Sequence, residues 1–129
     1  MKFTVNREKF QKALQRVGSI IGARSMLPLL GNVLIEANEG GLTLCTTDLD
    51  IRITTGVEAD VAEPGRSTVP ARRLTSLVGS FSADTVEFAV DDKDHFKISC
   101  GTGRFTLLGL PAAEFPEPAV FEGVRELKL

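Results

Sequence analysis

Residues 3–17, FTVNREKFQKALQRV, decide the fold, because this combination of a short apolar run and a helix occurs twice in the chain. The apolar residues after Asn6 follow the spacing i, i+3, i+4, i+7 of one helix face: Phe10, Ala13, Leu14 and Val17. Asn6 is a favourable N-cap and Gly18 a favourable stop signal. The pattern predicts an amphipathic helix over residues 6–17.

A second unit of the same kind stands 64 residues later, at residues 67–78, STVPARRLTSLV. Pro70 at the first turn and Gly79 after the last turn predict a helix over residues 70–78. Its apolar positions match those of the first helix at the same offset: Leu74 with Phe10, Leu77 with Ala13, and Val78 with Leu14. The repeat indicates a duplicated unit with internal twofold symmetry.

Three strand-like runs follow each predicted helix. In the first half they are NVLIEAN (32–38), LTLCTTD (42–48) and LDIRITTGVEA (49–59); in the second half they are DTVEFAVD (84–91), HFKISCG (95–101) and RFTLLG (104–109). The offset between the halves falls here to 53 or 54, which matches Val33 with Val86 and Ile51 with Phe105. Each half is therefore expected to read strand, helix, three strands.

This repeat predicts one α+β domain over residues 1–129, with internal halves of about 1–63 and 64–110. Two short helices packed on antiparallel sheet are a common layer architecture. The connection GSIIGARSMLPLLG (18–31) makes the first half about ten residues longer than the second.

The segment CTTDLDIRI (45–53) brings Cys45, Asp48 and Asp50 within six positions. These side chains could be metal ligands or an acid/base pair, or the segment could be a turn that directs Leu49 and Ile51 into a core. A zinc site needs three or four ligands, and the only histidine of the sequence is far along the chain. Aspartate favours turns, so the turn is the preferred interpretation. We expect no catalytic residue, metal or cofactor.

The charges are separated along the chain, although the formal net charge is only −2. Residues 1–25 carry a local charge of +5 and residues 64–83 one of +3, which leaves −10 for the remainder. On a helical wheel, Lys9, Lys12 and Arg16 fall together on one flank of the first helix. Such a field can attract a polyanion to one face, although a charged helix flank is also typical of a solvated surface.

Nothing in the sequence predicts a membrane or secreted protein. The start, MKFTVNREKF, lacks the apolar run of a signal peptide, and no stretch approaches the roughly 20 apolar residues of a membrane helix. Cys45 and Cys100 lie in strand-like runs, which favours buried, reduced thiols over a disulfide. The expected location is the cytoplasm.

Several segments closely resemble, in this order, the first domain of the bacterial sliding clamp, the beta subunit of DNA polymerase III: MKFTVNRE, LPLLGNVLIEA, TTDLDIRI, TVPARRL and RFTLLGLPAAEFP. The resemblance runs from Met1 to about Leu129 with almost no gaps. It implies the DNA-clamp fold, in which each domain holds two helices against sheet.

The resemblance also implies a function. In this family, three such domains per subunit and two subunits placed head to tail form a ring around double-stranded DNA. Helices line the hole, and the ring acts as a processivity factor that tethers DNA polymerase III after a clamp loader has placed it. The ring itself has no catalytic activity. Family members are much longer than this chain, so the chain is expected to be a first domain that lacks the second and third.

The resemblance assigns roles to individual positions. Together with the charge pattern, it implies DNA contacts by Arg24, Arg72, Lys12 and Arg16. It implies a subunit interface formed by Arg73, Leu77, Phe105 and Leu107. Thr102 and His95 depart from the family pattern, because some members have arginine at these two positions.

Two other functions remain as alternatives to the clamp domain. One is a hydrolytic enzyme that uses Asp48 and Asp50 with a divalent metal. The other is a β-rich protein-interaction module whose basic helices are only solvated and bind no DNA.

Overall fold

The computed structural model describes residues 1–19, 31–48 and 51–115. The first half forms β1 (Lys2–Asn6), α1 (Arg7–Gly18), β2 (Asn32–Asn38), β3 (Gly41–Thr47), β4 (Arg52–Val57) and β5 (Ala59–Glu63). The second half forms β6 (Gly65–Pro70), α2 (Ala71–Gly79), β7 (Thr85–Val90), β8 (His95–Cys100) and β9 (Gly103–Leu108), followed by the single 3-10 turn η2 (Ala112–Glu114). Both helices begin one residue later than predicted, and Asn6 caps α1 by accepting a hydrogen bond from the Lys9 N–H at 2.9 Å.

The described strands form two antiparallel sheets, sheet A in the order β5-β1-β7-β8-β9 and sheet B in the order β4-β3-β2-β6. The first strand of each half therefore lies in the sheet of the other half. Val5 in β1 pairs with Val86 in β7, and Val69 in β6 pairs with Val33 in β2. Since Val5 and Val69 are 64 residues apart in the sequence, the register confirms the predicted repeat.

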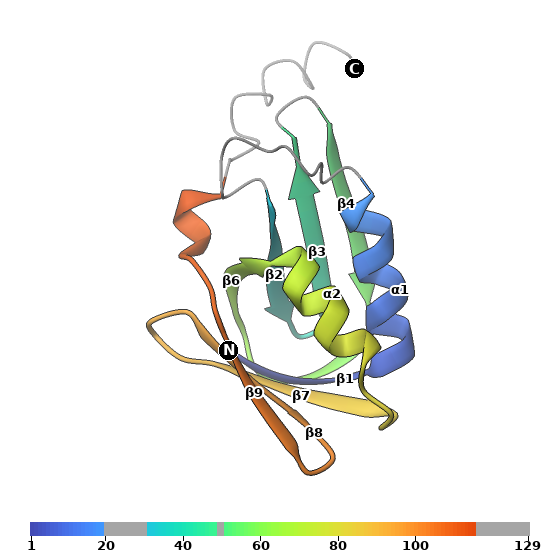
Figure 1. Ribbon diagram of the computed structural model, residues 1–129. Coiled ribbons are helices and arrows are strands. Elements are labelled where there is room, and N and C mark those ends of the chain that lie inside the picture. The colour runs from blue at the N-terminus through green and yellow to red at the C-terminus, as the bar shows by residue number, and fades with distance from the viewer. Residues whose placement is uncertain (20–30, 49–50, 116–129) are drawn as a thin grey trace.

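The two helices lie side by side against the sheets (Figure 1). Helix α1 contacts β1, β3 and β4, and α2 contacts β2 and β6. The helices run antiparallel, because Gln11 near the start of α1 lies beside Gly79 at the end of α2. Between helices and sheets lies the main core, to which the helices contribute the predicted apolar residues: Phe10, Ala13, Leu14, Val17, Leu74 and Val78, all buried. The α+β clamp-like fold is confirmed.

One strand was not predicted. The run 49–59 was expected to be a single strand, but the structure ends β4 at Val57 and begins β5 at Ala59, so the strand changes sheets at Glu58. Strand β5 pairs with β1 at the edge of sheet A. Its sequence, ADVAE, holds two acids and one β-branched residue and is only partly buried, so it gives little of the alternating pattern by which a strand is recognised.

The connection between β3 and β4 also differs from its counterpart in the second half. Leu44 pairs with Thr55, whereas the equivalent Ile98 pairs with Phe105, which sets the offset in the last strand to 50. The predicted match of Ile51 with Phe105 is therefore wrong, because the first connection contains extra residues. Ile51 is 53% exposed, so the expectation that it points into a core is wrong as well.

Candidate nucleic-acid interface on the helix layer

The solvent face of α1 carries the cations that the sequence predicted there. Lys12 and Arg16 are exposed, since the opposite face of the helix packs into the core. The Lys12 ammonium lies 3.5 Å from the Glu8 carboxylate, and the Lys9 ammonium lies 3.7 Å from Glu58. Exposed pairs of this kind contribute little to stability, so both lysines can exchange these partners for another anion.

The start of α2 adds positive charge beside α1. Arg72 and Arg73 are exposed in the first turn, which contains no acidic residue. Pro70 precedes this turn and offers no side-chain hydrogen bond to its N–H groups. The first turn of a helix carries a partial positive charge. The two guanidinium groups therefore reinforce a field that already attracts anions.

A groove of about 390 Å³ joins the end of α1 to the start of α2. Gln15 and Ser19 line it from α1, and Arg72 and Ser76 line it from α2. The groove brings Arg72 to the end of α1 that also carries Arg16. Side chains of these types are the ones that contact phosphate and sugar oxygens in protein–DNA complexes.

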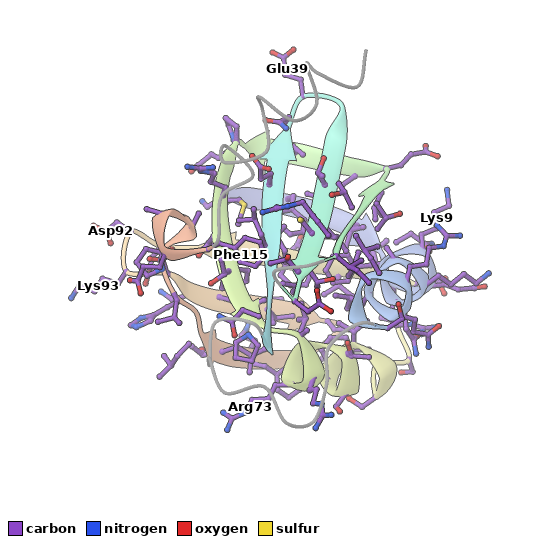
Figure 2. The ribbon with its side chains drawn as sticks, turned by 90° about the horizontal axis from the view of Figure 1, so that it is seen from above. Lys9, Glu39, Arg73, Asp92, Lys93 and Phe115 are labelled. Atoms are coloured by element: carbon purple, nitrogen blue, oxygen red, sulfur yellow. The ribbon has the colours of Figure 1, made fainter. Side chains whose placement is uncertain are left out.

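The helix layer is strongly basic compared with the rest of the chain. The two helices contain six bases and one acid, a net +5, whereas the whole chain has a formal charge of −2. Within the described part of the chain, Arg16, Arg72 and Arg73 form no ion pair. Figure 2 shows Lys9 and Arg73 extending away from the body of the molecule. Arg24, the remaining predicted DNA contact, lies outside the described residues.

The residues predicted for a subunit interface lie on β9 and α2. Strand β9 is an edge strand of sheet A, so one side of its backbone has no partner strand among the described residues. Phe105 on this strand is 39% exposed, and Arg73 on α2 is fully accessible. Leu107 and Leu77 are only half-buried and pack against the main core. Phe105 is thus the most exposed of the three apolar side chains.

Phe81 is a residue of this surface that the sequence analysis missed. Its ring lies against that of Phe105, with the centroids 5.3 Å apart and the planes inclined by 35°. Phe81 stands 64 residues after Val17 in the sequence. Extending the helical repeat by one more position would have identified it.

The carboxylate of Asp48 closes the connection between β3 and β4. Its Oδ1 accepts a hydrogen bond from the Ile51 N–H at 2.6 Å, and the Asp48 N–H donates to the Ile51 carbonyl at 3.1 Å. Asp48 is therefore a turn residue, as the preferred interpretation held, while Leu49 and Asp50 lie outside the described residues. In the part of the chain that the structure describes, no three His, Cys, Asp or Glu side chains gather as a metal site would require.

The two cysteines are free and buried, as predicted. Cys100 belongs to the main core. Cys45 lies on the outer side of sheet B, where the Arg52 Nη1 is 3.0 Å from its Sγ. Neither thiol lies on the helix layer.

His95 is a surface residue, as expected. Its Nδ1 lies 3.5 Å from the Asp91 carboxylate, which also accepts hydrogen bonds from the backbone N–H groups of His95 and Lys93 at 3.0 and 2.9 Å. The hydrogen bond from the His95 N–H, followed by that from Lys93, holds the pKa of Asp91 below its ordinary value. Thr102 lies exposed in the two-residue turn between β8 and β9.

Comparison with known proteins agrees with this arrangement of helices and sheets. Residues 1–119 match the family model of the N-terminal domain of the DNA polymerase III beta subunit. The chain belongs to the DNA polymerase III beta subunit family. The beta sliding clamp of Salmonella typhimurium is 41% identical over 118 residues, which cover 90% of this chain and 32% of that relative.

Solved structures of the family share the fold. The DNA polymerase sliding clamp of Caulobacter crescentus superposes with a TM-score of 0.86 at 34% identity, and the alignment covers 91% of this chain and 32% of that one. The DNA polymerase III subunit beta of Pseudomonas aeruginosa gives a TM-score of 0.83 at 38% identity, with the same coverage.

The chain spans about a third of the length of the curated family members that it matches. Over the described residues, no helix is both long enough and apolar enough to cross a membrane.

Proposed function

We propose that this chain acts as the first domain of a sliding clamp and that its helix layer faces double-stranded DNA. The observation that carries the proposal is the concentration of exposed cations on α1 and α2, within a chain that is acidic overall. Lys12, Arg16 and Arg72 are the described side chains that would meet phosphates, and Arg24 would join them.

Such contacts suit a protein that moves along DNA. Salt-dependent binding of lysine and arginine to phosphate does not depend on the base sequence and permits sliding. The groove between the helices offers hydroxyl and amide groups beside Arg72, all of which can bind the backbone of either strand. The domain supplies a surface and no chemistry, so its role is non-catalytic.

The assembly extends the proposal to the full-length protein. A ring closes when the β9 edge, with Phe105 and Leu107, joins a different edge of a second subunit in a head-to-tail homodimer. In that form it tethers DNA polymerase III, after a clamp loader has opened it, and works in the cytoplasm. Heterologous interfaces of this type generate closed rings when the rotation permits.

Binding of a fluorescently labelled duplex to this chain at several salt concentrations tests the DNA-facing role. With three or four phosphates contacted, log K should fall with log salt with a slope of about −3, at roughly −0.9 per contact. Affinities for unrelated sequences should agree within about tenfold, because few base-reading contacts are expected. Salt-independent binding, or a stronger preference for one sequence, would contradict the proposal.

The ring is tested separately with the full-length protein. It should remain on a nicked circular duplex during gel filtration and slide off after the circle has been linearised. The alternative function, a β-rich interaction module, predicts no salt-dependent binding of duplex by the chain and no difference between the circular and linear duplex.

A further inference from the structure

Residues 109–115, which we call the clasp, carry the chain from β9 across sheet B. The amide of Leu110 donates to the Thr68 carbonyl at 3.0 Å, and the Thr68 amide donates to the Leu110 carbonyl at 3.1 Å. The Thr68 hydroxyl donates to the same carbonyl at 2.9 Å. These bonds extend sheet B by a single bridge beyond β6. The clasp thus takes the position at β6 that β5 takes at β1 in the other half.

Gly109 fixes the point at which the clasp leaves the body. Its N–H donates to the Asp94 carbonyl at 2.8 Å. A Cβ on Gly109 would lie 2.2 Å from the Thr68 oxygen and 2.7 Å from the Asp94 oxygen. The chain passes here between two backbones with no room for a side chain. Beyond this point, nothing of the clasp enters the main core.

The clasp has an apolar cluster of its own. Ala112 and Phe115 pack with Leu34 and Cys45 on the outer side of sheet B, and all four side chains are buried. The Arg52 guanidinium lies 5.7 Å from the centre of the Phe115 ring, and its Nη1 contacts the Cys45 Sγ. Phe115 lies over the strands of the sheet, whereas Asp92 and Lys93 extend away from the body (Figure 2).

We propose that the clasp is a separate cooperative unit, which opens while the two sheets and two helices stay folded and which sets the direction of the chain after Phe115. A small cluster joined to the body by few backbone hydrogen bonds has a lower opening free energy than the main core. Since the outer side of sheet B faces the clasp, its opening uncovers the Cys45 thiol without breaking a strand pair. Cys100, within the main core, stays covered.

This inference gains its functional meaning from the proposed function. If further domains follow this one in a clamp, the clasp is the first part of the joint between them. A closed clasp then holds the next domain at a fixed angle, and an open clasp lets that joint bend, as a ring that must open for loading requires.

Thiol modification of the folded chain tests the clasp. Both thiols are buried, Cys45 at 4% and Cys100 at 9% exposure, so each reacts only through an opening of the structure. With N-ethylmaleimide under native conditions and peptide mapping by mass spectrometry, Cys45 should react faster than Cys100. Phe115→Ala should raise the Cys45 rate by about tenfold or more and leave the Cys100 rate within about twofold.

Phe81→Ala is the matched control, because it removes a ring of the same size outside the clasp. It should not raise the ratio of the Cys45 rate to the Cys100 rate. Equal rates for both thiols, or a parallel rise of both in Phe115→Ala, would overturn the proposal. Should Phe115→Ala misfold, hydrogen exchange of the unaltered chain decides: the Leu110 amide should exchange faster than that of Ile98, and equal protection would refute the clasp. Neither measurement depends on DNA binding.

Discussion

The ring of Phe81, just after α2, supports the ring of Phe105 on the edge strand β9, with the ring centroids 5.3 Å apart. An apolar side chain on an open strand edge is normally a liability, because the unpaired backbone beside it can pair with another chain. Here the helix layer holds Phe105 in place while 39% of it stays exposed. The edge is therefore ordered and apolar, as a surface for a partner strand must be.

We expect the chain to be monomeric at micromolar concentration, because two copies of one edge do not reproduce an interface between unlike surfaces. At higher concentration the open edge should self-associate, and Phe105→Lys should suppress this, since charge on an edge strand opposes pairing. Leu107→Lys should also suppress it, at a cost in stability, because Leu107 packs against the core. Sedimentation velocity over a concentration series measures both, with Thr102→Lys as control. A stable closed dimer or hexamer of the unaltered chain would contradict this expectation.

Arg72→Ala should flatten the salt dependence of duplex binding by about one unit of slope, since it removes one phosphate contact. Arg24→Ala is expected to act in the same way. Fluorescence anisotropy with a labelled duplex gives the slope. Lys93→Ala removes an exposed cation at the β7–β8 turn, away from the helices, and should leave the slope unchanged. An equal effect of all three substitutions would show that binding depends on total charge and not on the helix layer.

Asp48→Ala should lower the free energy of unfolding by about 1 kcal/mol, because it deletes the acceptor for the Ile51 N–H. Asp48→Asn retains an oxygen acceptor and should cost less. Urea titration provides the measurement, and Asp92→Ala in the exposed β7–β8 turn serves as the control. Calorimetric titration should detect no tight binding of zinc or magnesium. Tight metal binding that disappears in Asp48→Asn would revive the enzymatic alternative.

Gly109→Ala should destabilise the chain by about 2–3 kcal/mol, because the new Cβ meets two backbone oxygens that cannot move independently. Gly18→Ala has open space around its Cβ and lies in α1, so it should stabilise by about 0.5–1 kcal/mol through helix propensity. Thermal and urea unfolding of both variants give the comparison. A neutral Gly109→Ala would mean that the clasp does not pass between β6 and the β7–β8 turn.

Stability should fall in the acid range partly through Asp91. Its folded pKa lies below its ordinary value, chiefly because the carboxylate accepts the His95 N–H. A carboxyl of this kind stabilises the fold above its unfolded pKa, and the contribution is lost as pH falls through the folded pKa. Carboxyl carbon NMR should show Asp91 titrating below a typical aspartate, and Asp91→Asn should make unfolding less dependent on pH in that range. An ordinary titration midpoint for Asp91 would refute this.

Local pattern was sufficient to predict the helices and most strands. The spacing from Phe10 to Val17 and the offset of 64 to the second helix both survive in the structure, because they reflect one buried face used twice. Pattern could not predict that β1 and β6 exchange sheets, since pairing across the chain leaves no local signal. Strand β5 was missed for a related reason: it is stabilised by its neighbour β1 and not by its own composition.

For the candidate site, the sequence predicted which side chains are exposed but not what lies beside them. The wheel placed Lys12 and Arg16 on the solvent side of α1, and the structure agrees. The groove that joins Arg72 to the end of α1 depends on the antiparallel packing of two helices far apart in the sequence. The support of Phe105 by Phe81 and the burial of Phe115 likewise come from tertiary packing.

The exchange of first strands also governs the order in which the chain can fold as it leaves the ribosome. Strand β1 emerges first, but β7, which covers it with Phe88 stacked on Phe3 at 4.7 Å, begins only at Thr85. At roughly 5–20 residues per second, translation leaves β1 without that partner for about 4–16 seconds. During this interval β1 can pair only with β5, on its other side. A nascent chain that stalls before Thr85 therefore exposes an apolar strand, and it should be a substrate for chaperones rather than half of a folded domain.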